Sequence, residues 1–443
     1  MSTVTPPQPR APAADDVKSG RIRITEFDFD LARVPLRRPL GFKGAAISEK
    51  WVSRISFTGS GGCRATAYGG YAVLWSDDRV FLSHSECGAN ALMAAVTEFG
   101  IQCARRVKFQ TPLELQDSIL SEVHEYACSI TRLPDLNPAF TLNALVAVDH
   151  AAWLLFAQER GLENFDEFVA AGCGQRLPAR HSSVGGIPLL SYNTTRAEMV
   201  RLAAAGYFMF KINLGASGGP AEMLTADKAR LALIHEAIGA TFTPHTSDGK
   251  VRYYLDANGR YKSRAQVEEL LSFAQSLGFL EQIALFEEPF AEPRAESLDG
   301  LPVLFTADES LRSVKDLAGI MDAGIRAVTV KPAGKGLSAT LRMIAEAIRL
   351  GAVVLVSDSS CTPLMLDWNK NVAARLPALP GMKFGLMEIN GHQNYAQWDR
   401  LLARHPDAGR SWLKPKRGIF RLPASFYKSG GGIFASSGPR AAR

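Results

Sequence analysis

Between about residues 187 and 388 the chain alternates short apolar runs with longer segments whose apolar residues recur every three or four positions. The short runs are typical of buried β-strands, and the longer segments are typical of amphipathic helices. This repetition favours an α/β fold with a parallel (β/α) barrel of the TIM type, and the alternative is a doubly wound open sheet. The predicted barrel strands cover residues 188–193, 207–213, 252–256, 283–288, 303–308, 327–331, 353–358 and 384–388.

The part of the chain before the barrel has a different pattern, which predicts an α+β domain. Two segments, 23–31 and 51–59, alternate apolar and polar side chains as half-buried strands do, and the segment between them, 35–50, is a predicted loop rich in Pro, Gly and charge. Helices are predicted at about 87–107 and 112–125, and one continuous helix at 139–161. The predicted organisation is a disordered tail at 1–21, an α+β domain at 22–140, the barrel at 141–400 and a basic C-terminal extension at 401–443 that is flexible at its end, from about residue 429.

Carboxylates end three consecutive predicted barrel strands, at Asp256, Glu287 and Asp308. Side chains at the carboxyl ends of neighbouring barrel strands meet on one face, where the active sites of such barrels lie. Three carboxylates in one place repel each other unless a cation lies among them, and Mg²⁺ prefers oxygen ligands. The alternative is that each carboxylate caps the following helix. Because side chains alternate along a strand, we expect the neighbouring Glu288 and Glu309 to point away from the metal.

Other polar residues are predicted to face the same place. Lys331 ends the sixth strand, and we expect burial near a metal to lower its pKa so that it acts as a general base; the alternative is a salt bridge to a carboxylate. Lys211 and Asn213 share one face of the second strand, where Lys211 either neutralises a substrate carboxylate or pairs with Asp256 or Glu287. Glu388 ends the eighth strand and either organises a developing negative charge or has no role.

Composition and charge exclude several other classes of protein. The net charge of +6 arises from residues 398–443, which carry ten Lys or Arg and two Asp without the aromatic interleaving that stacks on bases, so no nucleic-acid partner is expected. No apolar stretch has the length of a membrane span, and the start of the chain has no signal-peptide core. The six cysteines and eight histidines lack zinc-ligand spacing, so we expect reduced thiols and a cytoplasmic protein.

Six segments occur in a specific order: PLGFKGAA (39–46), AVDHAAWLL (147–155), LDAN (255–258), FEEP (286–289), ADES (307–310) and KPAGKG (331–336). This order resembles the enolase superfamily, and most closely its branch of muconate-lactonizing enzymes and dipeptide epimerases, over residues 22–390. The resemblance implies a capping domain before a modified barrel, with the end of the chain returning to the cap. It implies Mg²⁺, or Mn²⁺, on Asp256, Glu287 and Asp308, with Lys331 as the base. It also implies a small carboxylate substrate under the first of these segments, and a homo-oligomer.

The chemistry that the resemblance implies is removal of the proton α to a carboxylate, with the enolate held by the metal. The branch carries Lys-x-Lys in its second strand, whereas this chain has Lys211, Ile212 and Asn213, which weakens the case for a two-base racemase. A one-base isomerase or lyase is therefore expected, of cycloisomerase, epimerase or elimination type. KPAGKG also resembles the methylaspartate ammonia-lyases. The mandelate racemase-like branch, with its sugar-acid dehydratases, uses a histidine at the end of strand seven, where this chain has Asp358. The remaining alternatives are a non-catalytic member that binds a metal and a carboxylate, and a barrel enzyme of unrelated chemistry.

Overall fold

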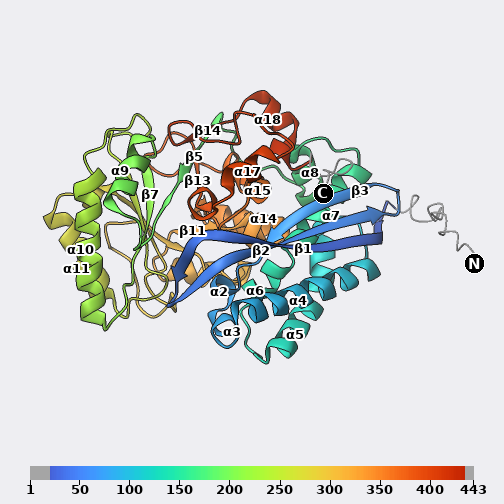
Figure 1. Ribbon diagram of the computed structural model, residues 1–443, viewed down its shortest axis with the longest axis horizontal. Coiled ribbons are helices and arrows are strands. Elements are labelled where there is room, and N and C mark those ends of the chain that lie inside the picture. The colour runs from blue at the N-terminus through green and yellow to red at the C-terminus, as the bar shows by residue number, and fades with distance from the viewer. Residues whose placement is uncertain (1–19, 435–443) are drawn as a thin grey trace, which may run out of the picture.

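The structure, a computed structural model, describes residues 20–434 and contains two β-sheets (Figure 1). One sheet is antiparallel and comes from the start of the chain, and the other is largely parallel and forms a barrel. The fold class predicted from the sequence, a TIM-type barrel preceded by an α+β capping unit, is therefore confirmed. The domain limits near residues 140 and 400 stay a prediction, and the predicted flexible segments at 1–19 and 435–443 lie outside the described residues.

The antiparallel sheet and the helices beside it are called the cap below. Its strands lie in the order β3-β2-β1-β4, and α4 and α5 run alongside them in Figure 1. The elements are β1 (Ile22–Phe42), β2 (Ala45–Gly59), β3 (Arg64–Gly70), α2 (Val73–Ser76), α3 (Asp78–Leu82), α4 (Glu86–Arg106), β4 (Lys108–Phe109) and α5 (Pro112–Thr131). Helix α4 lies within one residue of its predicted bounds, and α5 begins at the predicted residue but continues six residues beyond the predicted end.

The hairpin of β1 and β2 is longer than predicted. The predicted loop at 35–50 is wrong, because both strands continue through it and only Lys43 and Gly44 form the turn. Proline is disfavoured inside paired strands, which suggested a break. The strand accommodates Pro35 by a register shift between Pro35 and Leu40, so that pairing resumes beyond it. The hairpin tip consequently reaches residues of the barrel, with which it lines a cavity.

The barrel closes because its first strand is split in two. Strand β5 pairs with β13 and strand β6 pairs with β7, and only Pro188 separates β5 from β6, so the parallel sheet returns to itself. A last strand, β14 (Ile419–Arg421), adds antiparallel to β5. The barrel strands are β5 (Ser183–Ile187), β6 (Leu189–Leu190), β7 (Met209–Asn213), β8 (Arg252–Asp256), β9 (Ile283–Glu287), β10 (Phe305–Ala307), β11 (Ala327–Val330), β12 (Val353–Val356) and β13 (Gly385–Glu388).

The first barrel strand lies earlier in the chain than predicted. The sequence pattern placed it at 188–193, whereas the main pairing is made by β5, which contains two consecutive glycines. Glycine has a low strand propensity, so the sequence pattern does not predict a strand over this segment. Here the glycines make room for neighbours: a Cβ at Gly185 would lie 2.6 Å from a Leu386 methyl, and one at Gly186 would lie 2.5 Å from an Ile389 methyl. Close packing therefore explains the strand that propensity missed.

Helices surround the barrel and connect it to the cap. Those between strands are α9 (Arg196–Ala204), α10 (Pro220–Ile238), α11 (Arg264–Ser276), α12 (Leu317–Asp322), α13 (Pro332–Lys335), α14 (Leu337–Arg349) and α15 (Pro363–Ala373), with 3-10 turns η1 (Leu280–Gln282) and η2 (Val314–Asp316). Before the barrel lie α6 (Pro138–Ala144), α7 (Val146–Glu159) and α8 (Phe165–Cys173), and after it α16 (Gly391–Asn394), α17 (Trp398–Ala403), α18 (Ala424–Lys428) and η3 (Gly430–Gly432).

The single helix predicted at 139–161 is two helices, α6 and α7, which meet at Leu145 with a bend of 51°. Both pieces are buried on nearly all sides, so the apolar pattern contains no stripe whose shift would reveal the break. Within residues 20–434 no single helix has the length and apolarity to cross a membrane, although this bent pair passes that test by length and composition.

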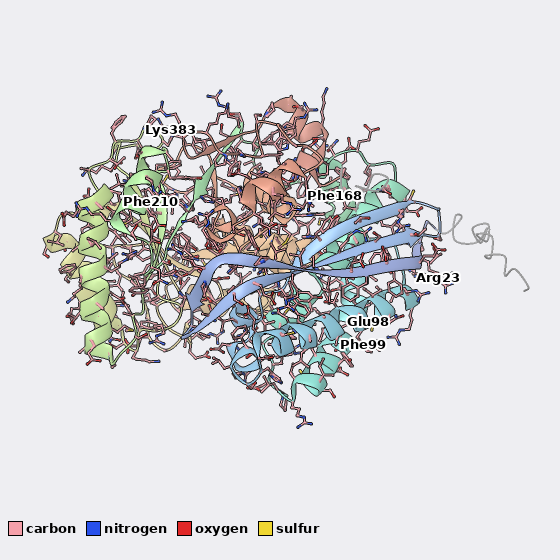
Figure 2. The ribbon with its side chains drawn as sticks, in the orientation of Figure 1. Arg23, Glu98, Phe99, Phe168, Phe210 and Lys383 are labelled. Carbon is pink, nitrogen blue, oxygen red and sulfur yellow. The ribbon has the colours of Figure 1, made fainter. Side chains whose placement is uncertain are left out.

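Two contacts show how the parts are held together. Phe168 of α8 packs near Trp153, Trp368 and Phe434, and so joins helices before and within the barrel to the end of the described chain (Figure 2). The expected disorder from residue 429 therefore does not extend to η3, which is buried. At the cap, the Asn143 amide donates to the carbonyls of Gly70 and Gly334 at 3.2 and 3.1 Å and accepts from the Ala72 N–H at 2.7 Å.

Candidate active site

The structure brings the predicted site residues together at the carboxyl ends of the barrel strands. Asp256 and Glu287 are the last residues of β8 and β9, Asp308 and Lys331 directly follow β10 and β11, and all four side chains are buried. The strands are largely apolar and charged residues stand at their carboxyl ends, so the hydrophobic core anchors the backbone while the charges lie at the barrel mouth. The other predicted residues, Lys211, Asn213 and Glu388, line the same cavity.

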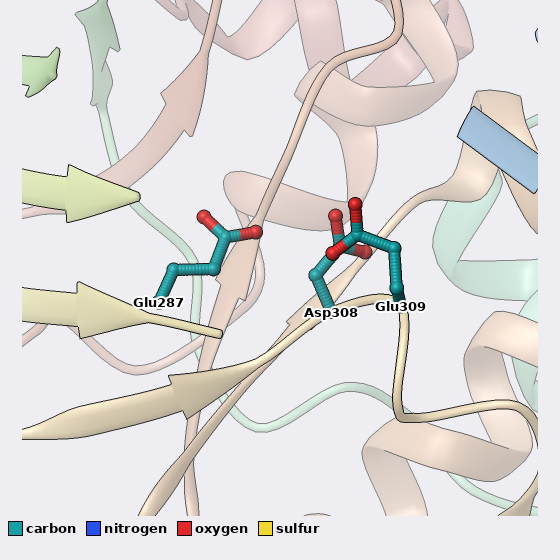
Figure 3. Close-up of side chains that lie close together, drawn as sticks. All are labelled: Glu287, Asp308 and Glu309. Carbon is teal, nitrogen blue, oxygen red and sulfur yellow. The ribbon is translucent and has the colours of Figure 1, made fainter. Parts of the chain in front are cut away.

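Glu287, Asp308 and Glu309 form the carboxylate group best placed for a metal. Their ligand oxygens all lie within 4.8 Å of one another, and Figure 3 shows the three side chains pointing toward a common space. Oε1 of Glu287 and Oδ1 of Asp308 are buried without a hydrogen-bond partner, whereas Oε2 of Glu287 lies 2.8 Å from the Lys211 ammonium. Buried carboxylate oxygens in this condition are costly unless a cation binds them. An all-oxygen donor set fits a hard divalent cation such as Mg²⁺.

The two neighbouring glutamates differ from each other. Glu288 points away from the group, as predicted, and its Oε1 accepts hydrogen bonds from the Asp308 and Ser310 backbone N–H groups at 2.7 and 2.8 Å and from the Ser310 hydroxyl at 2.6 Å. The expectation for Glu309 is wrong, because its carboxylate joins the group. Strand β10 ends at Ala307, so strand alternation no longer governs residue 309.

Asp256 lies on the Lys211 side of Glu287. The Nζ of Lys211 is 3.0 Å from Asp256 Oδ2, 2.8 Å from Glu287 Oε2 and 3.3 Å from Glu388 Oε2. Burial alone would lower the pKa of Lys211, but the three carboxylates outweigh burial and raise it well above its usual value. This arrangement matches the ion-pair alternative of the sequence analysis. Burial raises the pKa of Asp256 to about 6 despite the attraction of Lys211.

Lys331 makes the ion pair that was its alternative role. Its Nζ lies 2.5 Å from Asp308 Oδ2 and 4.3 Å from the centroid of the Trp75 ring. Burial lowers the pKa of Lys331, but the carboxylates of Asp308, Glu309 and Glu287 together outweigh burial and the repulsion of Lys211, so the net shift is upward. The expected lowering of this pKa is thus wrong for the protein alone. Asp308 makes the largest upward contribution.

Glu388 holds the strand ends in place. One of its oxygens, Oε2, accepts from the Ser357 hydroxyl at 2.6 Å and from the Asp358 N–H at 3.2 Å, besides its contact with Lys211, and Oε1 accepts from the Asn390 amide at 3.1 Å. The side chain therefore has its hydrogen-bonding capacity largely filled by protein groups. This arrangement suits a residue that orients Lys211 and the loop after β12.

The cap supplies residues that sequence reasoning missed. The cavity above the carboxylates has a volume of about 110 Å³. On the cap side it is lined by Leu40, which lies in the segment that the resemblance placed over the substrate, and by Ile47, Lys50, Tyr71, Val73, Leu74, Trp75 and Phe81. The Trp75 indole donates to Asp308 Oδ2 at 3.3 Å, and Lys50 Nζ donates to the Ser359 carbonyl at 2.6 Å. These pairs are 233 and 309 positions apart in the chain, so no local pattern could have revealed them.

Comparison with known proteins identifies the family. The family model described as "Enolase C-terminal domain-like" matches residues 194–419, which is more than half of the chain and contains all of the predicted site residues. The chain belongs to the enolase superfamily. No curated protein matches its sequence. The enolase-superfamily assignment agrees with the fold and with the order of motifs at the ends of the barrel strands.

Solved structures share the fold over nearly the whole chain. A dipeptide epimerase from Enterococcus faecalis V583, complexed with Mg and the dipeptide L-Leu-L-Tyr, is 16% identical with a TM-score of 0.63, and the match covers 93% of this chain and 99% of that one. The L-Ala-D/L-Glu epimerase from Bacillus subtilis is 15% identical with a TM-score of 0.64, covering 90% and 96%. The N-succinyl Arg/Lys racemase from Bacillus cereus ATCC 14579 is 15% identical with a TM-score of 0.62, covering 91% and 93%. At such identities the likeness to these enolase-superfamily members is one of fold.

Proposed function

We propose that this protein is a Mg²⁺-dependent isomerase or lyase that removes the proton α to a carboxylate of a small acid. The observation that carries the proposal is a pair of buried carboxylate oxygens without hydrogen-bond partners, Glu287 Oε1 and Asp308 Oδ1, beside the buried amine of Lys331. Two of the similar solved structures are epimerases and one is a racemase, and one was complexed with Mg, which supports the same class of reaction.

The residues proposed to hold the metal are Asp256, Glu287 and Asp308, with Glu309 as a further oxygen donor. When bound, Mg²⁺ supplies positive charge that stabilises the enolate oxygens, without which an amine is too weak a base for a carbon acid. The buried oxygens of Glu287 suit this assignment, because burial and the nearby Asp256 raise the pKa of Glu287 well above its usual value, and a cation relieves that cost.

Lys331 is proposed as the base that accepts the α-proton at Nζ. Its pKa is raised by the Asp308 carboxylate against the effect of burial, so it falls when that carboxylate is shared with a cation. Lys211 is proposed as a fixed cation, since three carboxylates hold it protonated. Asn213 is half-buried at the end of β7 and can orient the substrate but cannot exchange a proton. A reaction with one base, Lys331, follows from these roles.

The test is deuterium incorporation into candidate acids. The protein is incubated with Mg²⁺ in D₂O and pools of amino acids, dipeptides, N-acyl amino acids, sugar acids and lactones, and masses are then measured. We expect mass gain or conversion that disappears in Lys331→Ala and persists in Lys383→Ala, whose lysine lies on the surface away from the barrel mouth (Figure 2). Exchange that survives in Lys331→Ala contradicts the assignment of the base.

The alternative is a non-catalytic member that binds a metal and a carboxylate. Asn213 in place of a second lysine, and the upward shift of the Lys331 pKa, favour it. Its signature is thermal stabilisation by an acid in the presence of Mg²⁺ without any exchange of the α-proton. A cytoplasmic location is proposed because all six cysteines are free, as reduced thiols are in that compartment. The predicted homo-oligomer stays a prediction.

A further inference from the structure

Lys50 is a buried cation that the proposed reaction does not use. It lies in β2 of the cap, only 2% of its surface is exposed, and its Nζ donates to the carbonyl of Ser359 at 2.6 Å. Among residues 20–434 no carboxylate lies within 4.0 Å of this ammonium. The carboxylate of Asp358, which acts on it from a greater distance, already accepts three backbone N–H groups, from Ser359, Cys361 and Asn390.

The surrounding structure makes room for this lysine. A Cβ on Gly70 would lie 2.7 Å from Lys50 Cε, so the glycine in β3 leaves the space in which the side chain crosses the sheet. Burial without a counter-charge is unfavourable for an ammonium group. Burial lowers the pKa of Lys50 to about 8, which leaves it protonated at pH 7. We take this buried charge, which Gly70 leaves room for, as an indication that the ammonium group has a binding role.

Lys50 lines the cavity of the candidate active site. Lys50 and Ser359 line the same cavity as Lys331 and Asp308, and Ser359 follows β12, the strand beside β11. The ammonium therefore stands on the Lys331 side of the site. It cannot replace the missing second lysine, which would lie on the β7 side. Apolar cap residues such as Val73 and Leu74 line the same cavity.

We propose that Lys50 binds a second carboxylate of the substrate, so that the acid taken by this site is a diacid with a short apolar spacer. This inference rests on the proposed function, which places the first carboxylate at the metal side of the cavity. The single positive charge of Lys50 matches one carboxylate rather than a doubly charged phosphate. The cavity volume of about 110 Å³ accommodates a short apolar spacer between the two carboxylates. The diacid would supply the counter-charge that the protein does not.

The test compares each diacid with its own half-amide, which has the same size and lacks the second charge. Glutarate, adipate and pimelate and their half-amides are titrated calorimetrically into the full-length protein with Mg²⁺. We expect at least one diacid to bind about tenfold or more tightly than its half-amide, as a charge-assisted hydrogen bond provides. Lys50→Met should reduce this ratio to about one, Lys50→Arg should retain part of it, and the surface variant Lys383→Met should retain all of it.

Equal affinity of the wild-type protein for every diacid and its half-amide overturns the inference, and so does a preference that survives in Lys50→Met. Folding of Lys50→Met is checked by thermal unfolding, where removal of an unpaired buried charge should raise rather than lower Tm. The result is separable from that of the deuterium experiment. A preference for the diacid without exchange of the α-proton would support Lys50 as a binding residue in a non-catalytic protein. Exchange of the α-proton without a preference for the diacid would support the proposed reaction and contradict the proposed role of Lys50.

Discussion

The indole N–H of Trp75 donates a hydrogen bond to the carboxylate of Asp308 at 3.3 Å, and thereby connects the cap to the candidate metal site. Trp75 lies in α2, a helix of one turn, and its ring also covers Lys331. Both the proposed base and a proposed metal ligand are therefore in contact with the same cap side chain.

Trp75→Phe should loosen the cap at α2. The substitution keeps an aromatic ring over Lys331 but leaves the buried Asp308 oxygen without this donor, at a cost of about 1 kcal/mol. We expect backbone hydrogen exchange in residues 71–77 to quicken about fivefold, measured by mass spectrometry. Trp412→Phe is the matched control, because the Trp412 indole N–H is buried without a partner. Equal protection of the segment in both variants would show that the hydrogen bond does not hold the cap.

Removing charge from the carboxylate group should weaken Mg²⁺ binding. For Glu287→Gln and Asp256→Asn we expect at least about a tenfold loss of affinity by calorimetric titration, since Mg²⁺ requires charged oxygen ligands. Glu309→Gln should also weaken binding if its oxygen, which lies within 4.8 Å of those of Glu287 and Asp308, contributes. Unchanged affinity in Glu287→Gln would refute the assignment of the site.

The control for this series is Glu288→Gln. Glu288 faces away from the group, and burial raises its pKa to about 8, so near neutral pH it already carries a proton much of the time. A glutamine oxygen can accept the same hydrogen bonds from Ser310 and Asp308. We therefore expect Mg²⁺ affinity close to that of the wild-type protein, and a loss as large as that of Glu287→Gln would mean that backbone disturbance explains both.

His150 should make the protein sensitive to acid. It is buried, it stacks on Trp368 at 3.9 Å, and burial lowers its pKa to about 3. The unfolded chain takes up the proton below a pKa of about 6.5 while the folded protein does not, so stability is lost as pH falls from 6.5 toward 3, by about 1.4 kcal/mol per pH unit. At pH 5 the loss attributable to His150 is about 2 kcal/mol.

The measurement compares urea unfolding at pH 7 and pH 5 in His150→Gln, which keeps a donor for the Pro332 carbonyl, and in the exposed control His84→Gln. The difference between variants is decisive, because burial raises the pKa of Asp149 to about 6 and gives an effect of opposite sign. His150→Gln should lose less stability between the two pH values than the control. Identical losses would exclude His150 as the source.

A buried cluster of charged side chains joins α15 to the segment after the barrel and should contribute to the free energy of unfolding. Asp367 of α15 lies 2.8 Å from Lys370 Nζ and 2.7 Å from His405 Nε2, and all three side chains are buried. Asp367→Asn leaves the Lys370 ammonium buried without its counter-charge, so we expect a loss of about 3 kcal/mol in the free energy of unfolding. The double variant Asp367→Asn with Lys370→Met should recover most of this loss in urea titrations. A double variant as unstable as Asp367→Asn would assign the effect to lost packing.

Sequence reasoning located the strand ends because each apolar run stops at a charged residue, as at Asp256 and Glu287, and local pattern determines this. It failed where a long-range contact overrides local preference. Gly185 and Gly186 lie in a strand despite their low strand propensity, because the packed neighbours leave no room for a larger residue at these positions. At Pro35 the strand continues through a register shift. Contacts between distant parts of the folded chain determine the orientation of Glu309 and the partner of Lys331. They also determine the positions of Trp75 and Lys50, which the cap contributes to the site.

The Asn143 amide has a consequence for how this protein can diversify. It bonds Ala72, which precedes the helix of Trp75, and Gly334, which follows Lys331 by three residues. The Asn143 side chain thus fixes the position of the Trp75 ring relative to the Lys331 amine. The hairpin tip at 39–46 lies outside this link, so its residues can be exchanged to admit new substrates while the spacing between ring and amine is preserved.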